Sequence, residues 1–458
     1  MMNLPSKIYF LGIGGIGMSA LARYFNSRGV EVHGYDRTCT ELTKQLSLEG
    51  MTIHYEENTE LIPLDCELVI RTPAVPKDSI EYQYIVKHNF TIKKRSQVLG
   101  EITRNHKCIA VAGTHGKTST SILIAHVLHS SGLKLTAFLG GISNNFKSNF
   151  IDSGDDYMVV EADEYDRSFL QLHPDIAVIN SLDADHLDIY GSRENMVESY
   201  LQFAGQIEED GLLLLSHHIS SHEVELFQSR VKSSVRVVRF GKPNLDAYSS
   251  TIQSNGEIGK FKYHDANVTI DDIEFKFPGK HNIENATAAI YIGLTIGIST
   301  NLIRKSLSTF EGIHRRFEIL YSDGITTLID DYAHHPTEIA AAIEATRAAF
   351  PNRHLLGIFQ PHLFSRTKDF YLEFANVLSQ LDELILLDIY PARELPMEGV
   401  SSQLIFDYTS ERLSKILTTK EKLIEILREK KLDVVLVLGA GDIDTKLNDI
   451  VGLIKSRL

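Results

Sequence analysis

Short apolar runs recur along the chain, and most are followed by a polar or glycine-rich stretch and then by a helical pattern. The clearest runs lie at residues 7–11, 30–35, 68–70, 109–112, 157–160, 176–179, 326–329, 355–359, 384–387 and 434–438. Runs of this length are typical of buried strands. Strands that alternate with helices predict parallel sheets covered by helices, which is an α/β fold. Because such sheets bind ligands at the carboxyl ends of their strands, the polar stretches after the runs are the candidate functional sites.

The pattern divides into three predicted domains. A length of 458 residues suits this number, since a typical domain has about 150 residues. A linker is expected near Glu101–His106 and a second one begins near Gly312, so the predicted domains cover residues 1–105, 106–313 and 314–458. Residues 248–277 alternate between polar and apolar side chains, which predicts an antiparallel extension of the second domain.

Composition narrows the class of protein. The net charge is −14, so nothing in the composition supports nucleic-acid binding. The three cysteines are scattered, which fits a reducing compartment. The first predicted strand begins by Lys7, which leaves no room for a signal peptide. No apolar run approaches the roughly 20 residues that span a bilayer. We therefore expect a cytoplasmic protein with no membrane partner.

A glycine-rich turn between a strand and a helix is the first candidate site. The run 109–112 leads into Gly113–Ser119 and then into a helical pattern. Backbone N–H groups in such a turn and the helix N-terminus bind phosphate, Lys117 would reach the terminal phosphates, and the Thr118 hydroxyl would help to hold Mg²⁺. Val111 stands where the usual motif has its first glycine. An ordinary turn with a surface lysine is the alternative, and we favour a nucleoside triphosphate site.

A second glycine loop follows the first apolar run. Gly12–Gly17 has the G-x-G-x-x-G spacing between a predicted strand and a predicted helix, and Asp36 lies 19 residues after Gly17. This arrangement is typical of a dinucleotide site in which the acidic residue binds a ribose hydroxyl. The loop requires only a diphosphate joined to a ribose, so NAD and a UDP-sugar fit equally well. A glycine turn without a ligand is the third interpretation.

Acidic, imidazole and amide side chains gather after other predicted strands. Residues 161–166 contain four carboxylates at a strand end, and this crowding favours a bound cation over a solvated loop. His186 lies between two aspartates just beyond the next strand, which makes it a candidate metal ligand. Asn282 and Asn285 share one face of a helix, where they either cap the helix or bind an adenine edge.

Together these motifs resemble those of the Mur ligases of bacterial peptidoglycan synthesis, and the resemblance covers essentially the whole chain. The motifs are Gly12–Gly17, Gly113–Thr118, Glu161–Glu164, Asp185-His186-Leu187-Asp188, Gly279-Lys280-His281-Asn282 with Asn285, Arg315-Arg316-Phe317, Asp331–Glu338 and Phe359-Gln360-Pro361-His362. The branch that adds L-alanine is the most similar. The resemblance implies an N-terminal Rossmann-like domain that binds UDP, a central parallel sheet with an ATPase-type phosphate loop, and a C-terminal Rossmann-like domain that binds the amino acid.

The resemblance also implies an activity. It is that of an ATP-dependent ligase that joins L-alanine to the carboxylate of UDP-N-acetylmuramate through an acyl phosphate. Because the carboxylate and the triphosphate repel each other, Lys117 and Mg²⁺ (or Mn²⁺) are needed to neutralise charge. UDP-N-acetylmuramate, L-alanine and ATP are the implied partners. We expect no nucleic-acid partner, and a monomer or a weak homodimer.

By position, the resemblance assigns residues to each substrate. The ATP-binding residues are Gly113, Thr114, His115, Gly116, Lys117, Thr118, Ser119, Asn282, Asn285 and Arg315. The UDP-sugar-binding residues are Gly14, Gly15, Ile16, Gly17, Asp36, Thr72, Pro73, Arg95, His115 and Asp163. The metal ligands are Thr118, Glu161 and His186, and the residues near the amino acid and the muramoyl group are Tyr332, His334, His362 and Arg366. Lys117, His334 and Arg366 are the expected catalytic residues, although nothing in the sequence separates His334 from His335 as the proton acceptor.

Two features bear on this assignment. Many Mur ligases carry a carbamylated lysine beside a second metal, but no lysine lies between Lys147 and Lys232, as in the alanine-adding branch. The environment of a second metal is therefore left open. Leu363 stands where some alanine-adding ligases carry an arginine, which places more of the anion binding on Arg366.

Three other functions compete with this interpretation. A recycling ligase that adds a whole tripeptide to the same UDP-sugar typically lacks the Gln-Pro-His and Arg-Thr pattern of residues 360–367. An NAD-dependent dehydrogenase would explain residues 12–36 but would leave Lys117 without a role. A non-catalytic nucleotide-binding switch would explain the phosphate loop but not the carboxylates and histidines.

Overall fold

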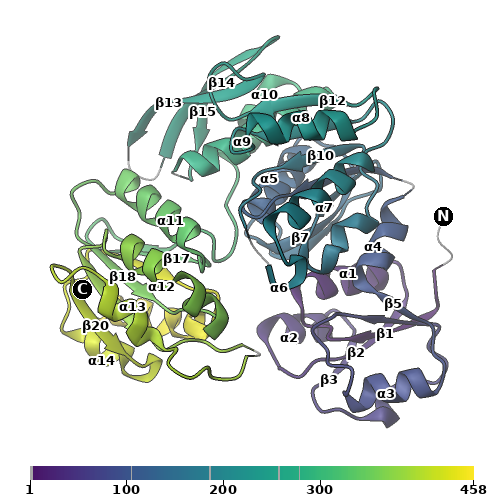
Figure 1. Ribbon diagram of the computed structural model, residues 1–458, viewed down its shortest axis with the longest axis horizontal. Helices are drawn as coiled ribbons and strands as arrows, with labels where there is room; N and C mark the ends of the chain where they lie inside the picture. The colour runs from purple at the N-terminus through teal and green to yellow at the C-terminus, as the bar shows by residue number, and fades with distance from the viewer. Residues whose placement is uncertain are drawn as a thin grey trace. The chain divides into compact units, whose positions relative to one another are not determined.

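The apolar runs form strands, and these strands assemble into three sheets with flanking helices (Figure 1). The structure is a computed structural model that describes residues 4–104, 106–184, 187–255, 258–277, 279–392 and 394–457. The chain forms two compact units. The larger unit contains Met1–Ser250, Tyr263–Asp271 and Glu284–Phe310, and the smaller unit contains Thr251–Lys262, Asp272–Ile283 and Glu311–Leu458. The predicted α/β fold class is confirmed.

The first sheet is parallel, with the strand order β3-β2-β1-β4-β5. Its strands are β1 (Lys7–Leu11), β2 (Glu31–Tyr35), β3 (Thr52–His54), β4 (Leu68–Arg71) and β5 (Ile92–Lys94), and its helices are α1 (Ile16–Ser27), α2 (Glu41–Leu48), α3 (Ile80–Lys87) and α4 (Arg95–Thr103). The connections change direction between β1 and β4. Rossmann-like sheets bind nucleotides at this position, and here it is bordered by the glycine loop after β1.

The second sheet has the strand order β15-β14-β13-β12-β11-β10-β6-β9-β7-β8. Its strands are β6 (Lys107–Ala112), β7 (Leu135–Ser143), β8 (Ser148–Asp152), β9 (Tyr157–Glu161), β10 (Ile176–Ile179), β11 (Leu212–Ser216), β12 (Arg236–Phe240), β13 (Ala247–Asn255), β14 (Ile258–Asp265) and β15 (Thr269–Phe275). The neighbours from β12 to β7 pair in parallel, whereas β8 is antiparallel to β7. The strand-rich character predicted for residues 248–277 is confirmed by β13, β14 and β15.

Four helices lie between strands of the second sheet in the chain, namely α5 (Lys117–Ser130), α6 (Leu187–Tyr190), α7 (Arg193–Gly205) and α8 (Ser221–Arg230), and α9 (Lys280–Ile296) and α10 (Thr300–Ser308) follow its last strand. Short 3₁₀ helices occur at Thr59–Leu61, Tyr165–Gln171, Lys420–Lys422 and Asp442–Lys446. Helix α5 begins at the phosphate loop, directly after the central strand β6. The phosphate loop therefore lies at the carboxyl end of a strand in the middle of the sheet, where a ligand is expected.

The third sheet belongs to the smaller unit and has the order β16-β17-β21-β18-β19-β20. Its elements are β16 (Glu318–Ser322), β17 (Thr327–Asp331), α11 (Pro336–Ala349), β18 (Leu355–Phe359), α12 (Phe364–Leu378), β19 (Glu383–Leu387), α13 (Ser402–Tyr408), β20 (Ser414–Thr418), α14 (Leu423–Arg428), β21 (Val434–Leu438) and α15 (Leu447–Lys455). Only β16 pairs in the antiparallel direction among these described strands.

Burial explains why the central strands are continuous apolar runs. All residues of β18, β19 and β21 are buried, because helices cover both faces of a parallel sheet. Two separate apolar clusters lie in this unit, one containing Phe359 and Leu436 and the other containing Ile358 and Val437. Alternate residues of one strand thus fill different cores. Among the described helices, none is long and apolar enough to cross a membrane.

Candidate functional site

The glycine loop of the first sheet lies directly against Asp36. Gly12 has a φ of +84°, a left-handed conformation that favours glycine, and the N–H groups of Gly12 and Ile13 donate to the carbonyl of Tyr35. The N–H of Gly14 donates to Oδ2 of Asp36 over 2.8 Å, and a Cβ at position 14 would come within 2.8 Å of the same oxygen. The acidic residue expected from the spacing is therefore in contact with the loop.

Helix α1 begins at the end of this loop, with Gly15 just before it and Ile16 and Gly17 in its first turn. A Cβ at Gly17 would lie only 2.9 Å from Nη1 of Arg95. Arg95 also donates from Nη2 to Oδ2 of Asp163 over 3.1 Å. A helix N-terminus beside a guanidinium group is a favourable environment for an anion such as a diphosphate.

Thr72 closes the other side of the glycine loop. Its Cγ2 atom lies 2.6 Å from the position that a Cβ at Gly12 would take, and Pro73 beside it is exposed. Two of the predicted UDP-sugar residues thus contact the glycine loop from different segments, Thr72 from just after β4 and Arg95 from the start of α4.

The phosphate loop requires glycine at two positions. Gly113 has a φ of +126° and Gly116 a φ of +77°. A Cβ at Gly113 would lie 2.9 Å from the backbone nitrogen of Ser181. Ser181 follows β10 and accepts hydrogen bonds from the N–H groups of Thr114 (3.2 Å, to the carbonyl) and His115 (2.9 Å, to Oγ). The neighbouring strand therefore fixes the backbone of the loop.

Lys117 is held at the loop by a buried carboxylate. Its Nζ atom donates to the carbonyl of Gly113 over 2.7 Å and to Oε1 of Glu164 over 2.8 Å. Burial disfavours the charged ammonium group, but the carboxylates of Glu164 and Glu161 outweigh burial, so the pKa of Lys117 is raised. The sequence predicted the lysine but not its partner. The position of Glu164, three residues beyond the end of β9, was the available signal.

Two of the three predicted metal ligands belong to the described residues. Thr118 is buried in the first turn of α5, and Glu161 is the last residue of β9. The Glu161 carboxylate takes the space that a side chain at Gly140 would fill, since a Cβ there would lie 2.0 Å from Oε2. A hydroxyl and a carboxylate are the oxygen donors that Mg²⁺ and Mn²⁺ prefer, so this donor set fits the ion. His186 and Asp185 lie outside the described residues.

Asn285 is connected to the helix that begins at the phosphate loop. Its Oδ1 accepts a hydrogen bond from Thr120 over 2.9 Å, and Nδ2 of Asn180 donates to the same threonine hydroxyl over 3.0 Å. Ser119 is half-buried at the preceding position of α5, and Asn282 lies in the first turn of α9. The hydrogen bond to Thr120 orients Asn285, and its contact with adenine stays a prediction.

In the smaller unit, Arg315 is buried between the ends of β17 and β21. Its Nη2 donates to the carbonyl of Gly439 over 2.6 Å and its Nη1 to that of Gly441 over 3.3 Å, while Nε lies 3.3 Å from Oδ2 of Asp330. Burial raises the pKa of Asp330 to about 7, although Arg315 opposes this shift. The phosphate contact expected for Arg315 stays a prediction.

Three of the residues predicted near the amino acid lie together. The ring centroid of His334 is 5.4 Å from that of Tyr332 and 5.9 Å from that of His362. Nδ1 of His334 lies 2.9 Å from the carbonyl of Tyr332, which assigns the ring proton to Nδ1. Burial lowers the pKa of His334 to about 4; Arg366 acts in the same direction and Glu338 against it. His334 is therefore a neutral imidazole whose Nε2 carries a lone pair.

His335 differs from its neighbour. Its side chain caps α11, accepting from the N–H of Thr337 over 3.4 Å, with Pro336 in the first turn. This structural role separates it from His334, which the sequence did not do.

The start of α12 has two features that could not be predicted from the sequence. Leu363, just before the helix, has a φ of +72°, which is unusual for a residue with a side chain. Glu394 accepts hydrogen bonds from the N–H and the hydroxyl of Ser365 and so caps the helix that carries Arg366. No pattern within the sequence connects positions 365 and 394.

Models of known protein families match three successive segments of the chain. Residues 7–107 match the Mur ligase family catalytic domain, residues 111–293 the Mur ligase middle domain, and residues 315–441 the Mur ligase glutamate ligase domain. The UDP-N-acetylmuramate–L-alanine ligase of Flavobacterium johnsoniae is 44% identical over 463 residues, covering 100% of each chain, and that of Christiangramia forsetii is 43% identical over 455 residues, covering 98% of each.

Solved structures are similar along their full length as well. The UDP-N-acetylmuramate–alanine ligase of Thermotoga maritima has a TM-score of 0.84 at 28% identity, with 99% of this chain and 100% of that chain covered. A murein peptide ligase from Psychrobacter arcticus has the same fold, with a TM-score of 0.72 at 21% identity and 98% of each chain covered. The family that the motifs resemble is thus confirmed, and the chain belongs to the Mur ligases.

Proposed function

We propose that this chain joins L-alanine to the carboxylate of UDP-N-acetylmuramate and converts ATP to ADP and phosphate, as a step in the synthesis of peptidoglycan precursors. The observation that carries the proposal is the end-to-end match to L-alanine ligases at 43–44% identity. The glycine loop, the phosphate loop and the histidines near β17 and β18 supply the groups that such a reaction needs.

The chemistry proceeds in two steps. The muramoyl carboxylate attacks the γ-phosphorus of ATP, the bond to ADP breaks, and an acyl phosphate forms. The amine of alanine then attacks the acyl carbon, and phosphate leaves as the amide forms. The first step brings two anions together, so positive charge must be fixed beside them before they react.

Lys117 is the residue that we assign to this task. It lies at the start of α5, where the helix N-terminus adds its own positive charge, and Glu164 holds it in place. We assign Thr118, Glu161 and His186 as ligands of Mg²⁺, with Mn²⁺ as a substitute. The bound ion would supply further positive charge toward the phosphates.

We assign the UDP-sugar to the first glycine loop, with Asp36 toward the ribose and Arg95 toward the diphosphate. In support, the backbone N–H of Gly14 already binds a carboxylate, and Arg95 packs on the N-terminus of α1. Asn282 and Asn285 would bind adenine.

In the smaller unit, we assign His334 as the group that accepts the proton of the alanine ammonium. Its neutral ring presents Nε2, because Nδ1 is committed to the carbonyl of Tyr332. Arg366, which lowers the pKa of His334, would bind a carboxylate of the substrates. Tyr332 and His362 would shape the pocket for the amino acid.

We also propose that each of the three predicted domains binds one substrate. Residues 1–105 would bind the UDP-sugar, residues 106–313 ATP, and residues 314–458 the amino acid. The partners would be these small molecules, and the protein would bind neither nucleic acid nor a membrane. It would act in the cytoplasm as a monomer or a weak homodimer.

Phosphate release from ATP tests the activity. With UDP-N-acetylmuramate present, release is expected only when L-alanine is added. Release that needs no amino acid would indicate a nucleotide-binding switch instead. Release only with the tripeptide L-alanyl-γ-D-glutamyl-meso-diaminopimelate would indicate the recycling ligase. Either outcome would contradict the proposal.

A further inference from the structure

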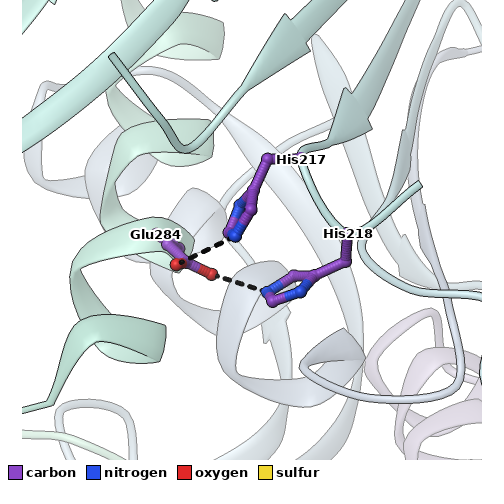
Figure 2. A group of neighbouring side chains, drawn as sticks. All are labelled: His217, His218 and Glu284. Atoms are coloured by element: carbon purple, nitrogen blue, oxygen red, sulfur yellow. Dashed lines mark hydrogen bonds and ion pairs between the residues drawn. The ribbon is translucent and has the colours of Figure 1, made fainter. Parts of the chain in front are cut away.

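His217, His218 and Glu284 converge at one point of the larger unit (Figure 2). The two histidines follow β11 directly, and Glu284 lies in the second turn of α9, 66 positions after His218. One ligand atom from each residue lies within 4.8 Å of the other two. Figure 2 shows both imidazole rings directing a nitrogen toward the carboxylate. None of these residues has a role in the function proposed above.

The distances suit an ion held among the three side chains. Nε2 of His217 lies 3.8 Å from Oε1 of Glu284, and Nε2 of His218 lies 3.1 Å from Oε2. A tetrahedral ion with bonds of about 2.0–2.2 Å keeps its ligand atoms about 3.4 Å apart. The two observed distances, which end at the two oxygens of the same carboxylate, lie on either side of this value, and a small movement of the exposed His218 would complete the site.

His217 supplies a second, independent observation. Its side chain is only 7% exposed, yet neither ring nitrogen makes a hydrogen bond to any residue within the described ranges. Nδ1 is buried and has no partner among the residues that the structure describes, and the 3.8 Å contact of Nε2 is too long for a hydrogen bond. Buried polar groups normally have a partner. A ligand at Nε2 would give that nitrogen a partner, while Nδ1 faces Gly241.

The ring of His217 is also fixed in its orientation. Its backbone N–H donates to the carbonyl of Phe240 over 2.8 Å. A Cβ at Gly241 would fall 2.5 Å from Nδ1, so the ring packs where only glycine leaves room. Nε2 therefore points at Glu284 without any rearrangement of the backbone.

We propose that His217, His218 and Glu284 bind one divalent transition-metal ion, with Zn²⁺ as the ion that best suits the donors. Two imidazole nitrogens and one carboxylate oxygen are typical zinc ligands, and the fourth position would go to water. Mg²⁺ prefers oxygen donors and would bind poorly here.

The ion would connect the segment after β11 to the start of α9. Glu284 precedes Asn285, which hydrogen-bonds to Thr120 in the helix that begins at the phosphate loop. Zn²⁺ binding is therefore expected to stabilise the larger unit. It shares no ligand with the Mg²⁺ site assigned to Thr118, Glu161 and His186.

Titration of the full chain with Zn²⁺ tests the proposal, with excess Mg²⁺ present so that oxygen-donor sites are filled. We expect one equivalent to bind, Co²⁺ to give the visible absorption of a tetrahedral site, and the Tm to rise on Zn²⁺ addition. His218→Ala and Glu284→Gln should each weaken this binding by about 100-fold or more, since the loss of a residue that only supports a metal ligand already costs about 10- to 100-fold. The matched control is His222→Ala, which changes an exposed histidine on the neighbouring helix α8.

His218→Ala changes an exposed residue and is the variant least able to disturb folding. A metal-free Tm close to that of the unmodified chain would show that the fold is intact. Equal Zn²⁺ affinity in the unmodified chain and in His218→Ala would overturn the proposal. An equal loss of affinity in His222→Ala would overturn it as well, because the ion would then be bound without selectivity for this cluster.

Discussion

The Nζ atom of Lys117 lies 2.8 Å from Oε1 of Glu164, whose side chain is 1% exposed. This buried ion pair fixes the ammonium group beside the carbonyl of Gly113, at the point where a triphosphate is expected. Because the pair is buried, each charge depends on the other for its stability. The arrangement keeps a cation ready in the loop before any anion binds.

Removal of one member of the pair should be costly. Glu164→Gln removes the carboxylate that contacts the buried Lys117 ammonium and leaves only the more distant Glu161 and Asp163 to offset its charge, so the free energy of unfolding of the larger unit should fall by about 3 kcal/mol. In the double variant Lys117→Met with Glu164→Gln, the destabilising effects of the two single substitutions should partly cancel. The coupling free energy between them should be about 1 kcal/mol or more. Urea denaturation followed by circular dichroism measures both values. Strictly additive effects would show that the two charges are not coupled.

The adjacent histidines of the smaller unit should behave differently. His334→Gln should lower kcat by about 100-fold, because the neutral ring that accepts the proton is lost. His335→Asn should keep nearly full kcat, since asparagine is a good helix cap and can replace the cap of α11. Steady-state ADP formation measures both variants. If the His335 variant loses activity and the His334 variant keeps it, the assignment is reversed.

Gly140 should be needed to place Glu161. A Cβ at this position would lie 2.0 Å from Oε2 of Glu161, so Gly140→Ala must displace the carboxylate. We expect the Mg²⁺ concentration for half-maximal activity to rise about 10-fold or more, as for other changes that disturb a metal ligand. Gly205→Ala is the control, because the nearest atoms to its Cβ are 3.6 Å away. An unchanged Mg²⁺ requirement in Gly140→Ala would argue against Glu161 as a ligand.

Asp330 should make stability depend on pH. Its pKa is about 7 in the fold, against an ordinary value of 3.8. Between these values the folded chain holds a proton that the unfolded chain has released, so the contribution of Asp330 to stability decreases as pH rises from about 4 to about 7. His334 acts in the opposite direction: its pKa of about 4 lies below the ordinary 6.5, so its contribution is lost as pH falls between these values.

Asp330→Asn isolates the contribution of the carboxyl group. The free energy of unfolding of the variant, relative to the unmodified chain, should increase from pH 4 to pH 7 by at most about 4 kcal/mol. His334 and Asp331 titrate in both proteins and cancel in the difference. If the difference in the free energy of unfolding between the variant and the unmodified chain does not change from pH 4 to pH 7, the Asp330 carboxyl group must ionise in the fold near its ordinary pKa.

Much of the fold could be predicted from the sequence, because buried parallel strands are apolar runs and glycine-rich stretches indicate the turns from strand to helix. Asp36 and Lys117 were predicted by local spacing. Contacts between distant segments could not be predicted in this way. Asn285 hydrogen-bonds to Thr120 from 165 positions away, and only the packing of α9 against α5 brings them together.

The same limit applies to the chemistry of individual groups. The sequence shows His334 beside His335, but only the structure shows that burial and the carbonyl of Tyr332 make His334 a neutral ring with its lone pair at Nε2. Likewise, His217, His218 and Glu284 gave no motif, because the third residue comes from a separate helix. Local patterns identify loops, whereas tertiary packing determines the partners and protonation states of side chains.

The central claim is that the Lys117 cation allows a carboxylate and a triphosphate to react, and the L-alanine-dependent formation of ADP by Lys117→Ala tests it most directly. We expect the rate to fall by about 1000-fold or more, and to stay low in the folded double variant Lys117→Met with Glu164→Gln. Full-speed, L-alanine-dependent ADP formation by the Lys117 variants would contradict the claim.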